Sequence, residues 1–128
     1  MITNALAGKP LPIYGDGLNV RDWLFVKDHC SAVLLVLQKG APGETFNIGG
    51  NCEKTNIEIV DVICQIMDQL NPIADGTSHS KLKSFVKDRP GHDRRYGIDS
   101  SKIQKDLGWS EGLVFEKGIQ DTVANYIS

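Results

Sequence analysis

The stretch of residues 85–99 combines a rigid turn with many basic side chains. Pro90 fixes its own backbone angle φ and Gly91 tolerates a positive φ, so the pair predicts a turn after a short strand that ends at Val86. Guanidinium groups match the oxygens of a phosphate, so arginines held by such a turn suggest an anion site. The charge pattern alone favours the alternative, a solvated loop with ordinary surface ion pairs. The charged residues around the turn are Lys81, Lys83, Lys87, Asp88, Arg89, His92, Asp93, Arg94 and Arg95.

The composition is that of a globular domain. With 128 residues, of which 41% are hydrophobic and 23% charged, the chain can bury one core. The net charge of -2 argues against a general nucleic-acid binder, which would need more basic surface than this one stretch. No apolar run approaches the roughly 20 residues of a membrane helix, and no signal-peptide pattern follows Met1. We therefore expect a cytoplasmic protein that binds neither membrane nor nucleic acid.

The cysteines and histidines do not form a recognisable metal or nucleophile site. The three cysteines are an odd number without a Cys-x-x-Cys pair, so neither a disulfide framework nor a thiolate metal site is indicated. We expect three reduced thiols, with Cys30 and Cys64 packed inside helices. The three histidines are His29, His79 and His92.

Apolar periodicity and turn formers predict a small α/β domain of short strands and four to five helices. Residues 55–70 give the strongest helical pattern, because Thr55 and Glu58 fit a capping box and apolar residues then recur at helical spacing. Residues 27–39 are predicted as a helix whose core, residues 32–37, is apolar on every side and so needs cover on most of its faces. The other expected elements are helices at 1–7, 100–107 and 115–127, with Trp109 folded back on the second of these, strands at 11–14, 20–26, 44–50 and 95–98, a turn at 15–17 and a mobile loop at 73–82.

With these residues in view, the chain resembles the C-terminal part of dTDP-glucose 4,6-dehydratases, which belong to the extended short-chain dehydrogenase/reductase family. The discriminating block is Arg-Pro-Gly-His-Asp at 89–93, because related sugar epimerases diverge after the Arg-Pro-Gly. The other blocks are shared loosely with nucleotide-sugar epimerases and decarboxylases. The matching blocks are Leu11-Pro12-Ile13-Tyr14-Gly15, Val20-Arg21-Asp22-Trp23-Leu24 with Val26 and Asp28-His29, Phe46-Asn47-Ile48-Gly49-Gly50, Asn56-Ile57-Glu58, and Asp88 to Asp93 with Arg95-Tyr96 and Ile98-Asp99.

In enzymes of that kind this region supplies the nucleotide end of the substrate site, so the resemblance implies roles for the matching residues. From the residues alone, structural roles stay open: an ion pair with Asp22 or Asp28 for Arg21, a helix-terminus role for Asn56 and core packing for Tyr14. The resemblance implies that Arg21 and Arg89 bind the diphosphate of a dTDP-sugar, and that Asp88, Pro90, Gly91 and His92 complete this diphosphate site. It implies that Pro12, Ile13 and Tyr14 line the pocket for thymine and deoxyribose. It also implies a hydrogen bond from Asn56 to the nucleotide.

The chain lacks the catalytic motifs of that family. The resemblance implies a reaction in which NAD takes a hydride from the sugar, water is lost and the hydride returns, converting dTDP-glucose to dTDP-4-keto-6-deoxyglucose. Here no Gly-x-x-Gly-x-x-Gly follows an N-terminal strand, and no tyrosine is followed four residues later by lysine. We therefore expect residues 1–128 to be a truncated substrate-binding domain that lacks the Rossmann half, holds no NAD and is inactive alone.

The apolar core of the helix at 27–39 predicts that the chain has a binding partner. An exposed apolar patch is a liability for a monomer, so we expect a homo-oligomer or association with a missing N-terminal half. Two alternatives remain: a fragment of a UDP-sugar epimerase or decarboxylase, and a self-associating interaction module that binds no nucleotide. Nucleic-acid binding through residues 81–95 is weakly supported, because the chain shows no repeated aromatic and basic pattern for stacking bases.

Overall fold

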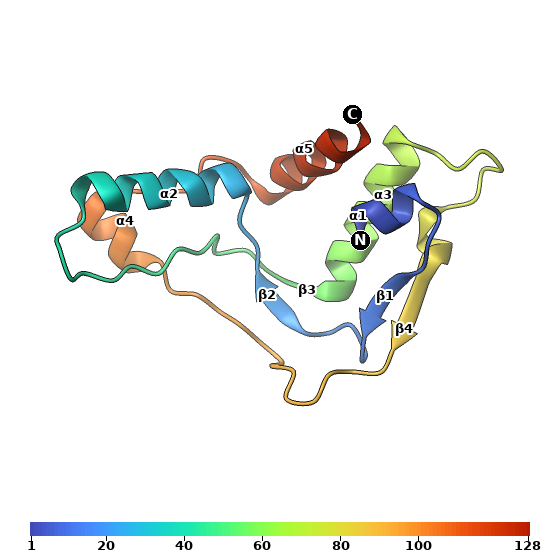
Figure 1. Cartoon of the computed structure of the whole chain (residues 1–128), viewed down its shortest axis with the longest axis horizontal. Helices are drawn as coiled ribbons and strands as arrows, with labels where there is room; N and C mark the ends of the chain where they lie inside the picture. The colour runs from blue at the N-terminus through green and yellow to red at the C-terminus, as the bar shows by residue number, and fades with distance from the viewer.

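The computed structural model describes all 128 residues and confirms a mixed α/β fold. Its elements form two groups, one around the long helix α3 and one in which α2 packs on α4 (Figure 1). The elements in chain order are α1 (Ile2–Leu6), β1 (Leu11–Tyr14), β2 (Val20–Asp22), α2 (Val26–Lys39), β3 (Glu53–Thr55), α3 (Asn56–Leu70), the 3₁₀ helix η1 (His79–Leu82), β4 (Lys83–Val86), α4 (Ser101–Leu107) and α5 (Phe115–Ile127).

Strand β1 pairs in parallel with β4, although about seventy residues separate them in the sequence. Leu11 lies opposite Lys83 and Tyr14 opposite Val86. The pairing extends one residue further, where the Gly15 amide donates to the Val86 carbonyl at 3.0 Å. Because parallel strands end at the same edge, the turn after β1 and the basic loop after β4 leave the sheet together.

Strand β2 pairs with β3 in the antiparallel sense, with Val20 opposite Thr55. Since β3 runs directly into α3, this pairing places the middle residue of β2, Arg21, beside the start of that helix. The other side of β2 contacts the basic loop through a parallel bridge between Val20 and Arg95. Strand β2 therefore lies between the N-terminus of α3 and the loop that follows β4.

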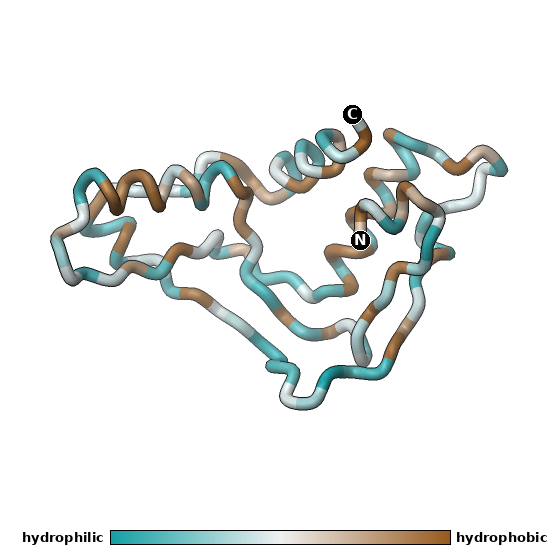
Figure 2. The backbone as a smooth tube through the Cα atoms, viewed as in Figure 1, coloured by the Kyte–Doolittle hydropathy of each residue, from teal (hydrophilic) through white to brown (hydrophobic).

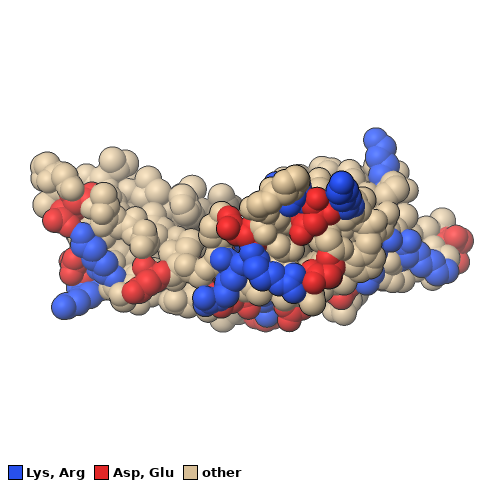
Figure 3. All heavy atoms as spheres, turned by 90° about the horizontal axis from the view of Figure 1, so that it is seen from below, with Lys and Arg blue, Asp and Glu red and all other residues tan.

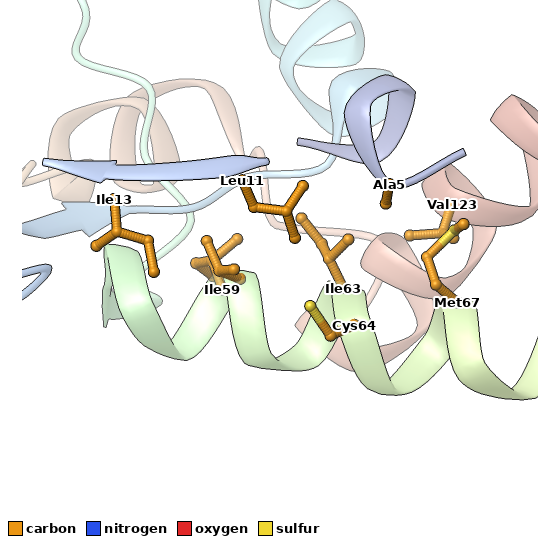
Figure 4. Packing of buried hydrophobic residues seen from close by; sticks show 9 residues of the cluster. Ala5, Leu11, Ile13, Ile59, Ile63, Cys64, Met67 and Val123 are labelled. Atoms are coloured by element: carbon orange, nitrogen blue, oxygen red, sulfur yellow. The ribbon is translucent and has the colours of Figure 1, made fainter. Parts of the chain in front are cut away.

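Helix α3 carries the main core. Its predicted capping box is present: the Glu58 amide donates to the Thr55 hydroxyl at 3.3 Å, and the Thr55 amide donates to the Glu58 carboxylate at 2.7 Å. One face of α3 packs on β1, α1 and α5 (Figure 4). The buried residues of this core are Ala5, Leu11, Ile13, Ile59, Val60, Ile63, Cys64, Met67 and Val123.

A smaller core joins α2 to α4. Its buried members are Ala32, Ile103 and Trp109, and the Trp109 indole N–H donates to the Ser31 hydroxyl at 3.0 Å. Gly108, with a φ of 73°, ends α4 in the left-handed conformation and turns the chain so that Trp109 returns over the helix, as predicted.

Helix α2 leaves much of its apolar surface uncovered, as its sequence indicated. Leu34 is 54% exposed and Leu37 is 78% exposed. The hydropathy colouring shows an apolar stretch within this helix, between polar ends, at one end of the molecule (Figure 2). None of the helices combines the length and the apolar character needed to cross a membrane.

Two strand predictions were wrong. Residues 44–50 form no strand, although Phe46 and Ile48 pack against the small core, because no other segment of the chain pairs with them. Residues 95–98 contribute only the single bridge at Arg95. The expected strand at 20–26 is shorter than predicted and ends at Asp22.

The prediction of a mobile loop at 73–82 was also incomplete. Helix η1 occupies its end, and His79 is 2% exposed because its ring and amide both contact the Asp68 carboxylate of α3, at 2.6 and 2.8 Å. Cys64 is buried as expected, whereas Cys30 is exposed on the uncovered side of α2.

Met67 offers a test of the main core. It is fully buried between α3 and α5, so Met67→Ala should lower the free energy of unfolding by about 2 to 5 kcal/mol. The matched control is Leu70→Ala in the same helix, where the side chain is 44% exposed and the loss should stay near about 0.5 kcal/mol. Urea denaturation followed by circular dichroism measures both, and equal losses would contradict this description of the core.

Candidate functional site

The end of β1 contributes one exposed aromatic side chain to the predicted site. Tyr14 is 40% exposed, Pro12 is half-buried, and Ile13 is only 2% exposed because its side chain lies in the main core. Only Tyr14 of these three therefore offers a large side-chain surface to a ligand. Gly15 follows with a φ of 59°, and a Cβ there would meet the Asp88 carboxylate at 2.8 Å, so the two loops are in close contact.

The turn after β4 is held together by its own side chains. Gly91 adopts a φ of 68°, and the His92 amide donates to the Arg89 carbonyl at 3.2 Å, which closes the predicted Pro-Gly turn. The His92 ring lies 2.6 Å from a carboxylate oxygen of Asp88 through Nδ1 and 3.0 Å from Nη2 of Arg89 through Nε2. Asp88, Arg89 and His92 thus form one hydrogen-bonded chain.

The hydrogen-bond partners of His92 indicate which of its ring nitrogens donates. A guanidinium can only donate, so Nε2 of His92 accepts from Arg89 and Nδ1 carries the proton that it donates to Asp88. The hydrogen bond from His92, assisted by the adjacent Arg89, holds the pKa of the Asp88 carboxyl below its ordinary value.

Two contacts place Tyr14 against this turn. The Arg89 guanidinium carbon lies 5.3 Å from the centre of the Tyr14 ring, and the edge of the His92 ring meets Tyr14 with 6.4 Å between the ring centres. A cation over an aromatic face is attracted by the π electrons, so Tyr14 helps to hold Arg89 in place. Most N–H groups of Arg89 remain available, because its side chain makes only the hydrogen bond to His92.

Arg21 reaches the same loop from β2. Its Nη2 donates to the Asp93 carbonyl at 2.9 Å and its Nη1 donates to its neighbour Val20 at 2.6 Å. Its guanidinium also lies over the ring of Tyr96, 4.7 Å from the ring centre. The ion pair with Asp22 or Asp28 that the sequence left open is absent, because those carboxylates accept backbone N–H groups instead.

The four arginines of the chain divide into two kinds. Arg94 and Arg95 are neutralised by carboxylates, whereas Arg21 and Arg89 have no carboxylate partner and lie against tyrosine rings. Acidic and basic side chains intermingle on the face of the molecule that carries this loop (Figure 3). The ion pairs nearby are Arg94 with Asp16 at 2.8 Å, Arg95 with Glu53 at 2.6 Å and Lys83 with Asp61 at 2.6 Å.

Asn56 joins the site through the N-terminus of α3. Its amide donates to the Asn19 carbonyl at 3.0 Å, while the Asn19 side chain donates to the same Asp93 carbonyl that binds Arg21, at 3.1 Å. The Asn56 side chain makes no hydrogen bond within the chain and is available to a ligand. The positive end of the α3 dipole lies here, and it favours a nearby anion.

The structure therefore brings together predicted residues from four separate segments, with the exception of Ile13, whose side chain lies in the main core. Three residues without a predicted role connect those segments, namely Asn19, Asp93 and Tyr96. The spacing Asp93-x-x-Tyr96, next to the Arg-Pro-Gly-His block, was the available signal. Neither of two cavities, of about 1010 and 510 Å³, is lined by the predicted site residues.

The chain contains no dinucleotide-binding turn of the kind that opens a helix. Gly15 and Gly17 adopt positive φ values, but the segment after them continues into β2 and not into a helix whose N-terminus would bind a pyrophosphate. The two sheets have two strands each, so no open parallel sheet presents a nucleotide-binding crevice. No group of three or more potential metal ligands is present.

Known proteins resemble this chain over nearly its whole length. The model of the GDP-mannose 4,6 dehydratase family matches residues 1–122. The dTDP-glucose 4,6-dehydratase of Xanthomonas campestris pv. campestris is 55% identical over 128 residues, which is 100% of this chain and 36% of that protein. The chain thus spans little more than a third of this relative.

Solved structures share the backbone fold of this chain. The dTDP-glucose 4,6-dehydratase DesIV of Streptomyces venezuelae, with NAD and TYD bound, is 40% identical with a TM-score of 0.82, over 98% of this chain and 36% of that one. The UDP-glucose 4-epimerase of Thermotoga maritima, with UDP-glucose, is 28% identical with a TM-score of 0.84, over 98% of this chain and 37% of that one. The fold is thus that of a portion of extended short-chain dehydrogenase/reductase enzymes.

The link between His92 and Asp88 can be tested by titration. Because the hydrogen bond from His92 lowers the pKa of Asp88, it stabilises the turn above the ordinary carboxyl pKa and is lost as the pH falls through the lowered value. In His92→Ala the pKa of Asp88 should rise toward its ordinary value, measured by carboxyl ¹³C NMR.

The control in that titration is Asp16, whose pKa is lowered chiefly by Arg94 and should not change. An unchanged Asp88 pKa, or equal rises for both carboxyls, would contradict the hydrogen-bonded chain through His92.

Proposed function

Because the chain belongs to the GDP-mannose 4,6-dehydratase family, we propose that it forms the nucleotide-binding portion of a dTDP-glucose 4,6-dehydratase. The substrate bound at this portion is dTDP-glucose, which the complete enzyme converts to dTDP-4-keto-6-deoxyglucose. Relatives with that name are 50 to 56% identical to this chain. Each is much longer than the matched part, so the activity belongs to the complete enzyme.

One observation carries the proposal: Arg21 and Arg89 are the two arginines without carboxylate partners, and both are held against aromatic rings beside one loop. An arginine that is fixed but not neutralised can give paired hydrogen bonds to phosphate oxygens. Two of them match the two phosphates of a nucleoside diphosphate. Asn56 adds an uncommitted amide at the positive end of α3.

The similarity to relatives supports a thymidine nucleotide over a uridine nucleotide. The dTDP-glucose 4,6-dehydratase relative is 55% identical, whereas the UDP-glucose 4-epimerase is 28% identical. The Arg-Pro-Gly-His-Asp block at 89–93 also builds the hydrogen-bonded turn, because its histidine links Asp88 to Arg89. An epimerase that diverges after Arg-Pro-Gly would lack this link.

The remaining steps of the reaction fall to parts of the enzyme that this chain does not contain. NAD supplies hydride removal and return in the complete enzyme, and this chain offers it no dinucleotide-binding turn. No Tyr-x-x-x-Lys is present to move protons at the sugar. The role of this portion is to bind the diphosphate and the base, which orients the sugar for chemistry carried out elsewhere.

The uncovered side of α2 is the surface through which this chain contacts a partner. Leu34 and Leu37 expose apolar surface that water covers at a free-energy cost, so this side packs against the remaining part of a complete enzyme or against a second copy of this chain. It lies at the far end of the molecule from β1 and β4 (Figure 1), so such a contact leaves the arginines accessible.

Replacing Arg89 tests the proposed site. Calorimetric titration should show saturable binding of dTDP that is tighter than binding of UDP. Arg89→Ala should weaken the dTDP affinity roughly ten- to a hundredfold, because a charge-assisted hydrogen bond contributes about 1.5 to 3 kcal/mol.

The matched control is Lys87→Ala, which removes a positive charge from the same exposed stretch but from a side chain outside the hydrogen-bonded chain. It should change the dTDP affinity little at moderate salt. Equal losses in the two variants would mean that general charge, and not the turn, attracts the nucleotide. No binding of dTDP to the parent chain would overturn the proposal for this portion alone.

A further inference from the structure

We propose that Tyr96 is a positioning residue, which orients Arg21 toward the diphosphate by stacking under its guanidinium. This rests on the function proposed above, and it assigns a role to a residue that belongs to a block matching the family but had no predicted role. Tyr96 is 53% exposed and belongs to neither hydrophobic core. Tyr96 therefore has no role in packing the cores of the fold.

The backbone brings Tyr96 to Arg21. The Val20 amide donates to the Arg94 carbonyl at 2.8 Å, and the Tyr96 amide donates to the Val20 carbonyl at 3.1 Å. This short parallel bridge connects the loop to β2 on the side opposite β3. It holds Tyr96 beside the residue that follows Val20, which is Arg21, and the guanidinium carbon lies 4.7 Å from the ring centre.

Asp93 contacts both side chains, one through its backbone and the other through its carboxylate. Its backbone carbonyl accepts from Nη2 of Arg21 at 2.9 Å, and its carboxylate accepts from the Tyr96 hydroxyl. One residue therefore fixes an edge of the guanidinium and the tilt of the ring beneath it. Asp93 directly follows His92, so the same loop segment also reaches Arg89.

This arrangement leaves several N–H groups of the Arg21 guanidinium free to bind a ligand. The ring covers one face of the guanidinium, and the carbonyls of Val20 and Asp93 each take one N–H group. The other N–H groups remain available for phosphate oxygens. A free arginine side chain would lose rotamer freedom on binding, whereas a stacked one has already lost it, so pre-orientation strengthens binding.

A proton-transfer role fits Tyr96 less well. Its hydroxyl proton is already donated to the Asp93 carboxylate, and this contact raises the pKa of the tyrosine above its ordinary value. The hydroxyl therefore stays protonated near neutral pH and is occupied within the chain. The contribution of Tyr96 comes from its ring face.

The experiment compares two substitutions at this position. Tyr96→Phe keeps the ring and should retain dTDP affinity within about twofold, whereas Tyr96→Leu removes the stack and should weaken it roughly two- to fivefold. In an Arg21→Ala background, Tyr96→Leu should have no further effect, because the tyrosine acts only through that arginine. The affinity for thymidine, which has no diphosphate, should be equal in all variants.

A second measurement reports on the stack without ligand. The ring current of Tyr96 should shift the Arg21 side-chain protons upfield in the parent chain and in Tyr96→Phe, and this shift should vanish in Tyr96→Leu. If dTDP binds the parent chain and Tyr96→Leu equally well, Tyr96 has no positioning role although the proposed function stands. If dTDP does not bind the parent chain, the proposed function of this portion fails and this inference fails with it.

Discussion

The parallel pairing of β1 with β4 is the constraint on which the candidate site depends. It joins two strands about seventy residues apart, and a parallel pair needs a long crossover, which here contains β2, α2, β3 and α3. Because both strands end at one edge, Tyr14 and the turn at 88–92 meet there. The apolar side chains of β1 bind this edge to α3, since Leu11 and Ile13 face Ile59 and Ile63 in the main core (Figure 4). Loss of the pairing would separate Tyr14 from Arg89, even if every side chain of the site were intact.

The four arginines near that edge differ in whether a carboxylate neutralises them. Carboxylates neutralise Arg94 and Arg95, while neutral groups hold the other two arginines: a tyrosine ring and a histidine nitrogen for Arg89, and a tyrosine ring and carbonyl oxygens for Arg21. Neutral partners fix the direction of a guanidinium without cancelling its charge, so its attraction for phosphate is preserved. Asp88 contributes indirectly, because it binds Nδ1 of the histidine whose Nε2 contacts Arg89. The site is therefore oriented toward an anion although the whole chain carries a net charge of -2.

Local patterns predicted the elements whose causes are local. The capping box at Thr55 and the helical spacing after it predicted α3, and Gly108 with Trp109 predicted the end of α4. Strand β3 was missed because Glu53, Lys54 and Thr55 carry no apolar alternation, and only pairing with a distant segment makes them a strand. The opposite error occurred at Phe46, where alternation was present without a partner strand. In the same way, the sequence motif marked Arg21 and Arg89, but the contact between Arg21 and Tyr96 depends on a bridge between distant segments and was not foreseen.

The central claim is that a nucleoside diphosphate binds where these four segments meet, and chemical-shift mapping tests it most directly. Amide spectra of the ¹⁵N-labelled chain would be recorded during addition of dTDP. Saturable shifts are expected to concentrate at residues 14–21, 56 and 88–96, with little change along α2 and α5. Shifts concentrated in the apolar cavity between α2 and α5, or an absence of shifts at millimolar dTDP, would contradict it.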